Sequence, residues 1–204
     1  MNLEDKTIVF LGSSVTYGSA SGGYSMCEYV KEKTEAIVEK WAISGTTLAD
    51  INESSYVNRL KNNIESQKKC DLFICQLSTN DASQDSSLGE LSDSENEEDF
   101  DITTVSGAIE YIISRVKNKW NCRIAFYTGT FFENDKYQEM VNLLFEIQKK
   151  WGIDIIDLWN DKQMRNVDSN DYERYMQDPV HPTKDGYTQW WGPKFVSYVM
   201  DYVK

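Results

Sequence analysis

The strongest constraint on the fold is an alternation along the chain between short apolar runs and longer amphipathic stretches. The first, third and fourth apolar runs lack a polar face, which is typical of central parallel strands covered on both sides. The strand candidates are residues 7–11, 36–43, 71–77, 123–128 and 154–158, and the helix candidates are 24–34, 55–67, 103–119, 136–151 and 185–203. This pattern predicts a three-layer α/β/α sandwich with a central parallel sheet of about five strands.

The last helix candidate, 185–203, carries a stripe of aromatic side chains at steps of three and four. The stripe consists of Tyr187, Trp191, Phe195, Tyr198 and Tyr202. Such spacing places the rings on one side of a helix, and a core-facing side is the simplest interpretation. We therefore expect these residues to pack against the sheet and assign them no cofactor.

Much of the negative charge lies in one segment. The chain has 204 residues and a formal net charge of -12, which suits a single domain spanning 1–204. Residues 82–101 are rich in Ser and contain eight acidic residues with no Lys or Arg. We interpret this segment as a solvated loop inserted after the third strand, where it is either passive or a lid. The acidic balance argues against nucleic acid or an anionic membrane surface as a partner.

Cysteine usage and the N-terminus point to a reducing compartment. Cys27, Cys70, Cys75 and Cys122 form no CxxC pair, and a single His leaves no Cys/His zinc set, so we expect free thiols and no metal. The first residues do not resemble a signal peptide, and no apolar stretch approaches the roughly 20 residues that span a bilayer. We expect a cytoplasmic protein without membrane insertion, and we assign it no cofactor.

Three loops that follow predicted strands carry polar or glycine residues that could serve a functional site. Ser13 and Ser14 follow Gly12 after the first strand, where a hydroxyl can stand at the start of a helix. Gly45 follows the second strand and can offer a backbone N–H, and Asn80 follows the third and can offer an amide. Because ligands bind beyond the carboxyl ends of parallel strands, all three loops lie at the edge of the sheet where a binding site is expected. Taken singly, each is also typical of an ordinary helix cap or turn.

His181 is the single histidine of the chain, so any chemistry that needs an imidazole depends on it. Imidazole is the side chain best suited to accept and return a proton near neutral pH. Asp178 stands three positions earlier, close enough in a turn to contact the ring. The alternative interpretation is a surface His in a loop that contains proline.

Taken together, these strings resemble the consensus blocks of the SGNH hydrolases, also called the GDSL esterase/lipase family. The matching strings are Gly12-Ser13-Ser14-Val15-Thr16, Ser44-Gly45, Ser78-Thr79-Asn80-Asp81 and Asp178-Pro179-Val180-His181, with Gly186 where the family often has a glycine. They occur in the family's order and span nearly the whole chain. Two positions depart from the family: Ser13 stands where it has Asp, and Ser78 where it has Gly. Alignment of Gly12 and Thr16 selects Ser14 over Ser13 as the nucleophile.

The resemblance implies a flavodoxin-like topology and a serine hydrolase mechanism. It implies that Ser14 attacks an ester carbonyl, that His181 acts as base and acid, and that Asp178 orients His181. The backbone N–H groups of Ser14 and Gly45 and the side chain of Asn80 are expected to bind the oxyanion. The expected partner is a small-molecule ester. The α/β-hydrolase fold is set aside because the chain contains no Gly-x-Ser-x-Gly string.

The substrate remains open at this level. We favour short acyl chains, such as O-acetyl groups on carbohydrate, with Tyr17, Phe131 and Phe132 as candidate substrate contacts. A lysophospholipase or thioesterase activity is the alternative within the family. A flavodoxin-like electron carrier that binds FMN is an alternative from another class, because Ser residues follow the first strand. A family member that binds without catalysis is a third interpretation.

Overall fold

The computed structural model describes residues 3–202, which contain one parallel sheet of five strands in the order β2-β1-β3-β4-β5. The strands are β1 (Thr7–Gly12), β2 (Ile37–Ala42), β3 (Leu72–Gln76), β4 (Arg123–Tyr127) and β5 (Asp154–Ile156). Every neighbouring pair runs parallel, so the carboxyl ends of all five strands share one edge. The predicted five-stranded α/β fold is therefore confirmed, with the strand order of flavodoxin-like proteins.

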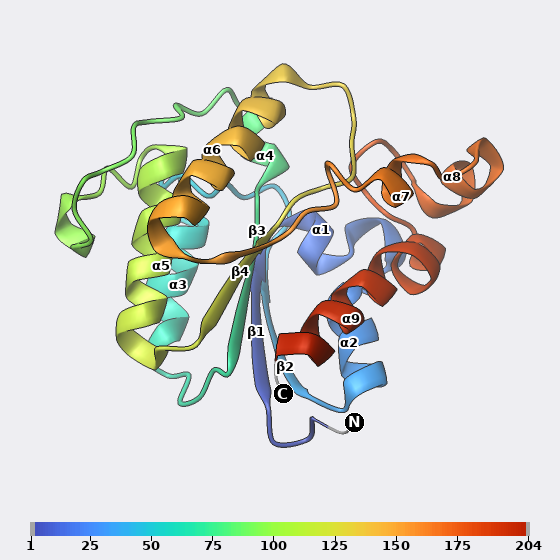
Figure 1. Ribbon diagram of the computed structural model, residues 1–204, viewed down its shortest axis with the longest axis horizontal. Helices are drawn as coiled ribbons and strands as arrows, with labels where there is room; N and C mark the ends of the chain where they lie inside the picture. Colours follow the sequence, from blue (N-terminus) through green and yellow to red (C-terminus); the bar gives the residue numbers. More distant parts are fainter. Residues whose placement is uncertain (1–2, 203–204) are drawn as a thin grey trace.

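Helices cover both faces of the sheet (Figure 1). The α-helices are α1 (Ser14–Tyr17), α2 (Met26–Thr34), α3 (Tyr56–Ile64), α4 (Thr79–Ser83), α5 (Val105–Trp120), α6 (Asp135–Trp151), α7 (Lys162–Arg165), α8 (Ser169–Tyr175) and α9 (Gly192–Tyr202). Short 3₁₀ helices η1 (Ser19–Ser21) and η2 (Glu97–Asp99) and a π-helix η3 (Gly186–Trp191) complete the described elements. None of the helices within residues 3–202 has the length and apolar character needed to cross a membrane.

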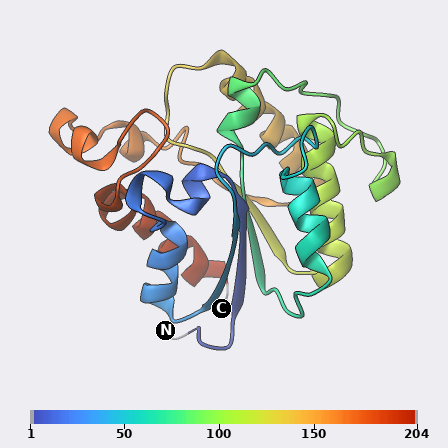
Figure 2. The same ribbon diagram turned by 180° about the vertical axis from the view of Figure 1, so that it is seen from behind.

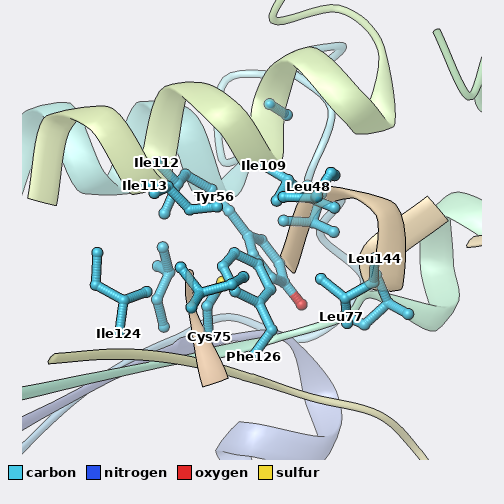
Figure 3. Close-up of a cluster of buried hydrophobic side chains, with 14 of the residues drawn as sticks. Leu48, Tyr56, Cys75, Leu77, Ile109, Ile112, Ile113, Ile124, Phe126 and Leu144 are labelled. Atoms are coloured by element: carbon cyan, nitrogen blue, oxygen red, sulfur yellow. The ribbon is translucent and has the colours of Figure 1, made fainter. Parts of the chain in front are cut away.

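The core lies in two layers, one on each face of the sheet. Helices α3, α5 and α6 cover one face, and α2 and α9 cover the other (Figures 1 and 2). In the first layer the ring of Tyr56 lies among aliphatic side chains of α5 and the side chains of Cys75 and Phe126 from the strands (Figure 3). Because β1 and β3 are buried along their whole length, both of their alternating faces must be apolar. This requirement produces the apolar runs in the sequence.

The predicted C-terminal helix consists of two parts, the π-helix η3 followed directly by the α-helix α9. Pro193 has no N–H to donate into an α-helical ladder, and Gly192 N–H instead reaches back five residues to Tyr187 O. The wider turn shifts the buried face by one residue. Tyr187, Trp191 and Phe195 are buried as predicted, but Val199 takes the next core position and Tyr198 is only partly buried. The side chain of Tyr202 lies outside the described residues.

The acidic segment 82–101 is ordered along the outside of the fold. Its first two residues belong to α4, and the remainder, which is largely irregular, runs beside α5 (Figure 2). Lys150 Nζ donates to the carbonyl oxygens of Ser92 and Ser94 at 2.6 Å each, and it pairs with the fully buried carboxylate of Glu110. Glu110 Oε2 also accepts from Ser92 N–H at 2.9 Å. These contacts hold the middle of the segment against α5 and α6.

Candidate active site

The turn between β1 and α1 presents Ser14 at the carboxyl edge of the sheet. Ser14 is the first residue of α1, where the backbone N–H has no partner within the helix. Gly12 is required by sterics, because a Cβ atom there would lie 1.7 Å from Thr16 Oγ1. Gly18 ends α1 in the left-handed conformation with φ of 85°. The sequence thus builds a tight strand–turn–helix that aims a serine at the edge where ligands bind.

Gln76, the last residue of β3, holds this turn in place through hydrogen bonds from its residues. Its Oε1 accepts from Ser13 N–H at 2.9 Å, from Thr16 Oγ1 at 2.8 Å and from Thr16 N–H at 3.3 Å. Tyr127 OH lies 2.6 Å from Thr16 Oγ1 and 3.2 Å from the same amide oxygen. Gln76 and Tyr127 could not be recognised from the sequence, because each lies at the end of an apolar strand without a motif of its own.

Ser14, His181 and Asp178 form a hydrogen-bonded chain. Ser14 Oγ lies 2.7 Å from His181 Nε2, and His181 Nδ1 lies 2.8 and 3.0 Å from the two carboxylate oxygens of Asp178. An ionised carboxylate can only accept, so Nδ1 carries the ring proton and Nε2 is left to accept from the serine hydroxyl. Ser14 is 7% exposed. The structure therefore brings together the three residues that the sequence predicted, in an order suited to nucleophilic attack.

The loop that carries Asp178 and His181 holds the acid in its charged form. Partial burial alone raises the pKa of Asp178, but hydrogen bonds from Val180 N–H, from the His181 ring and from His181 N–H outweigh it, and the net pKa lies below its usual value. Gly186 packs under this loop, where a Cβ atom would lie 2.2 Å from Tyr175 O. This close approach explains the glycine that the sequence places after the histidine.

Gly45 and Asn80 lie on adjacent loops at the same edge. Gly45 has a left-handed φ of 79°, and the space beside its Cα is open. Asn80 Nδ2 donates to Thr46 O at 2.9 Å, which places the amide beside the Gly45 loop with one N–H still available. Ser78 caps α4 by accepting from Asn80 N–H at 3.2 Å. The serine that departs from the family pattern thus orients the helix that carries Asn80.

Two buried charged side chains contact the loop of Gly45, and neither was assigned a role from the sequence. Asp81 accepts from Leu48 N–H at 2.7 Å and Ala49 N–H at 3.1 Å. Burial raises its pKa above the usual value, although these hydrogen bonds oppose the shift. Arg59 on α3 donates to Thr46 Oγ1 at 2.9 Å and to Gly12 O at 2.8 Å. Burial lowers the pKa of this guanidinium.

The three predicted substrate contacts occupy different surroundings. Tyr17 is 45% exposed at the end of α1, with Lys40 Nζ 5.6 Å from its ring centre. Phe131 and Phe132 both pack on Trp159, with ring centres 4.9 and 5.2 Å away. Phe132 faces inward, whereas Phe131 is 41% exposed. Phe131 and Phe132 lie in the loop after β4, at the same edge as Ser14.

Two cavities meet this edge. The first is lined in part by Val15 and Val180, the chain neighbours of Ser14 and His181, and its volume of about 10 Å³ holds roughly one water molecule. Its lining includes Val15, Thr79, Phe132, Val180 and Tyr127. The second is an open cavity of about 400 Å³ lined by Phe131, Glu133, Asn134, Asp135, Gln138 and Trp159. Within residues 3–202, no group of three or more His, Cys, Asp or Glu side chains is arranged to hold a metal ion.

Solved structures of other proteins share this fold at low sequence identity. A possible lipase from Chitinophaga pinensis DSM 2588 is 17% identical with a TM-score of 0.71, covering 96% of this chain and 98% of that chain. A putative GDSL-like lipase from Bacteroides ovatus ATCC 8483 is 18% identical with a TM-score of 0.66, covering 98% and 100%. A carbohydrate acetylesterase family member from Sinorhizobium meliloti is 14% identical with a TM-score of 0.64, covering 97% and 99%. No match was found among curated proteins.

The sequence itself matches a protein family over most of its length. The match is to the GDSL-like Lipase/Acylhydrolase family and covers residues 10–189. This range includes every string that carried the resemblance, from Gly12 to Gly186. The chain therefore belongs to the GDSL-like lipase/acylhydrolase family.

Proposed function

We propose that the protein is a serine esterase that cleaves short-chain carboxylic esters, such as O-acetyl groups on carbohydrate, through an acyl-enzyme on Ser14. The observation that carries this proposal is the 2.7 Å approach of Ser14 Oγ to His181 Nε2, with the Asp178 carboxylate on the other ring nitrogen. A flavin carrier has no use for this arrangement. Membership of an acylhydrolase family supports the same reaction class.

The mechanism uses each group in turn. Ser14 Oγ attacks the ester carbonyl while His181 Nε2 takes its proton, and the charged imidazole is stabilised by Asp178. The oxyanion is bound by Ser14 N–H, Gly45 N–H and the Asn80 amide, which all come from loops at the carboxyl edge of the sheet. His181 then gives its proton to the leaving alcohol, and it later activates the water that hydrolyses the acyl-enzyme.

The sizes of the two cavities support a short acyl group and a polar alcohol. A cavity with room for one water molecule accepts the methyl of an acetyl group but no extended chain. The larger cavity offers carboxylates, amides and aromatic rings, which suit the hydroxyls and apolar faces of a sugar. We place the acyl methyl against Phe132 and the alcohol near Phe131. The cytoplasmic location stays a prediction.

A longer-chain acyl hydrolase of the lysophospholipase or thioesterase type is the second candidate. Ile43 and Ile51, at the two ends of the Gly45 loop, are 46% and 50% exposed. Apolar side chains beside the candidate oxyanion loop offer a surface on which an acyl chain could lie outside the small cavity.

Hydrolysis of p-nitrophenyl esters from acetate to dodecanoate distinguishes these activities. We expect the highest kcat/KM for acetate or butyrate, with no turnover by Ser14→Ala. Phe132→Leu should move the optimum toward longer acyl groups, because it removes part of the wall of the small cavity. An optimum at octanoate or longer would select the second candidate. No release of p-nitrophenol from any ester by the folded protein would favour a binding protein without catalysis.

A further inference from the structure

Two cysteines lie together at the edge of the sheet opposite Ser14. Cys70 lies two residues before β3 and Cys122 directly before β4. The two strands are neighbours, paired in parallel from Leu72 and Arg123 onward. The sulfur atoms lie 3.7 Å apart, and both thiols are free. A disulfide bond of about 2.05 Å requires the two sulfurs to close by about 1.7 Å, which side-chain rotation between neighbouring strands can supply.

The two thiols differ in exposure, which gives them different roles. Cys70 is 7% exposed, whereas Cys122 is half-buried and lines an open cavity of about 210 Å³. Lys117 and Trp151 line the same cavity, and Lys117 Nζ lies 5.2 Å from the Trp151 ring centre. A cationic and aromatic wall next to an accessible sulfur favours approach of a small anionic reagent.

Hydrogen bonding between the sulfurs increases the difference in reactivity between the two thiols. The Cys70 thiol can donate to the Cys122 thiolate, and this hydrogen bond lowers the pKa of Cys122. The same interaction and burial together raise the pKa of Cys70. Cys122 is thereby favoured as the attacking sulfur, and Cys70 is placed to resolve the product.

We propose that Cys70 and Cys122 are a reversible thiol–disulfide site that reacts with low-molecular-weight disulfides such as oxidised glutathione. The Cys122 thiolate attacks one sulfur of glutathione disulfide, forming a mixed disulfide and releasing one glutathione thiolate. Cys70 then attacks the Cys122 sulfur, forming the protein disulfide and releasing the second glutathione. The two protein thiols are oxidised, one glutathione disulfide is reduced, and the two thiol protons pass to the two glutathione thiolates.

The consequence is a covalent clip on β3 and β4 away from the candidate active site. The clip closes the chain from residue 70 to residue 122, which includes the acidic segment and α5. A cross-link that closes a loop of this length lowers the conformational entropy of the unfolded chain and so stabilises the folded protein. We expect a higher thermal midpoint after oxidation and unchanged esterase activity, because both sulfurs lie at the amino ends of the strands.

Incubation of the purified full-length protein with graded ratios of oxidised to reduced glutathione tests this proposal. Intact mass should show the loss of two hydrogen atoms, and peptide mapping should join Cys70 to Cys122. Cys70→Ser should accumulate one glutathione on Cys122, roughly tenfold faster than Cys122→Ser takes any up. Cys75→Ala, which removes a fully buried thiol, is the matched control and should oxidise like the wild type.

Three outcomes would overturn the proposal: four thiols persisting at high oxidised glutathione, a cross-link between other cysteines, or equal glutathione uptake by the two serine variants. None of these results depends on esterase activity, which is measured separately with p-nitrophenyl acetate. A failure of the ester hydrolysis proposal leaves the thiol count and the peptide map unchanged. The two proposals therefore stand or fall separately.

Discussion

Arg59 Nη2 donates a hydrogen bond of 2.8 Å to the carbonyl oxygen of Gly12, the last residue of β1. Through Nη1 the same guanidinium reaches Thr46 Oγ1, next to Gly45. One buried cation thus joins the turn before Ser14 to the loop that offers the Gly45 N–H. The planar fork of arginine suits this double contact, which a lysine cannot reproduce. We infer that Arg59 is a positioning residue for the proposed oxyanion site.

Replacing Arg59 with Met should lower kcat about 10²-fold and leave KM nearly unchanged, because the loss falls on transition-state geometry. Arg59→Lys should recover only part of the rate. The comparison uses steady-state kinetics on p-nitrophenyl acetate, with circular dichroism to establish folding. Lys61→Met, on the same helix and 39% exposed at its side chain, should behave like the wild type. A folded Arg59→Met enzyme with full kcat would contradict the positioning role.

The choice of nucleophile between Ser13 and Ser14 is open to a direct test. We expect Ser14→Ala and His181→Ala each to lower kcat by about 10⁴ or more while the fold is kept. Ser13→Ala should retain most activity, because the structure directs the Ser14 hydroxyl, and not that of Ser13, to His181. The measurement is the kcat of each variant on p-nitrophenyl acetate, with thermal melts to establish that each variant is folded. Loss of activity in Ser13→Ala with full activity in Ser14→Ala would reverse the assignment.

Local sequence predicted the strands and the closeness of Asp178 to His181, whereas the choice of Ser14 as their partner came from the resemblance to the family. A strand buried on both faces must be apolar throughout, and Asp178 lies three residues from His181. Gln76 and Arg59 could not be found in this way. Gln76 meets Ser13 across 63 residues, and Arg59 meets Gly12 across 47. Their roles arise only when the parallel strand order brings the loops together.

Asn80→Ala should lower kcat on p-nitrophenyl acetate by about 10²–10³-fold, since one oxyanion donor is lost. The truncation also removes the hydrogen bond to Thr46 O, which belongs to the loop of Gly45. Ser83→Ala removes an exposed hydroxyl from the same helix and should leave kcat unchanged. Equal rates for Asn80→Ala and the wild type would remove Asn80 from the oxyanion site.

The contribution of Asp178 to stability should depend on pH. Its folded pKa lies below the usual value, so its stabilising effect is present above the unfolded pKa of about 3.9 and is lost as pH falls through the folded pKa. Asp178→Asn should therefore be less stable than the wild type near neutral pH, and the difference should shrink as pH falls below the unfolded pKa of about 3.9 and through the lower folded pKa. Urea unfolding at a series of pH values measures this. A difference that grows on acidification would be opposite in sign to the expected linkage.

The buried ion pair between Glu110 and Lys150 anchors the acidic segment, and it offers a test of whether that segment is a lid. Glu110 is fully buried and also accepts from Trp151 Nε1 at 3.0 Å, so Glu110→Gln leaves the Lys150 charge without its partner. We expect a loss of about 2 kcal/mol or more in the free energy of unfolding. Glu146→Gln, which breaks an exposed pair with Lys149 on the same helix as Lys150, should cost about 0.5 kcal/mol or less.

The same variants should keep the wild-type kcat/KM on p-nitrophenyl acetate at temperatures below unfolding. The reason is that the anchoring hydrogen bonds of the segment are made with Glu110 on α5 and Lys150 on α6 and not with Ser14 or His181. Limited proteolysis reports the loosening directly, because Glu110→Gln should be cleaved within residues 84–101 faster than Glu146→Gln. A large change in kcat/KM that accompanies faster cleavage would instead indicate that the segment acts as a lid.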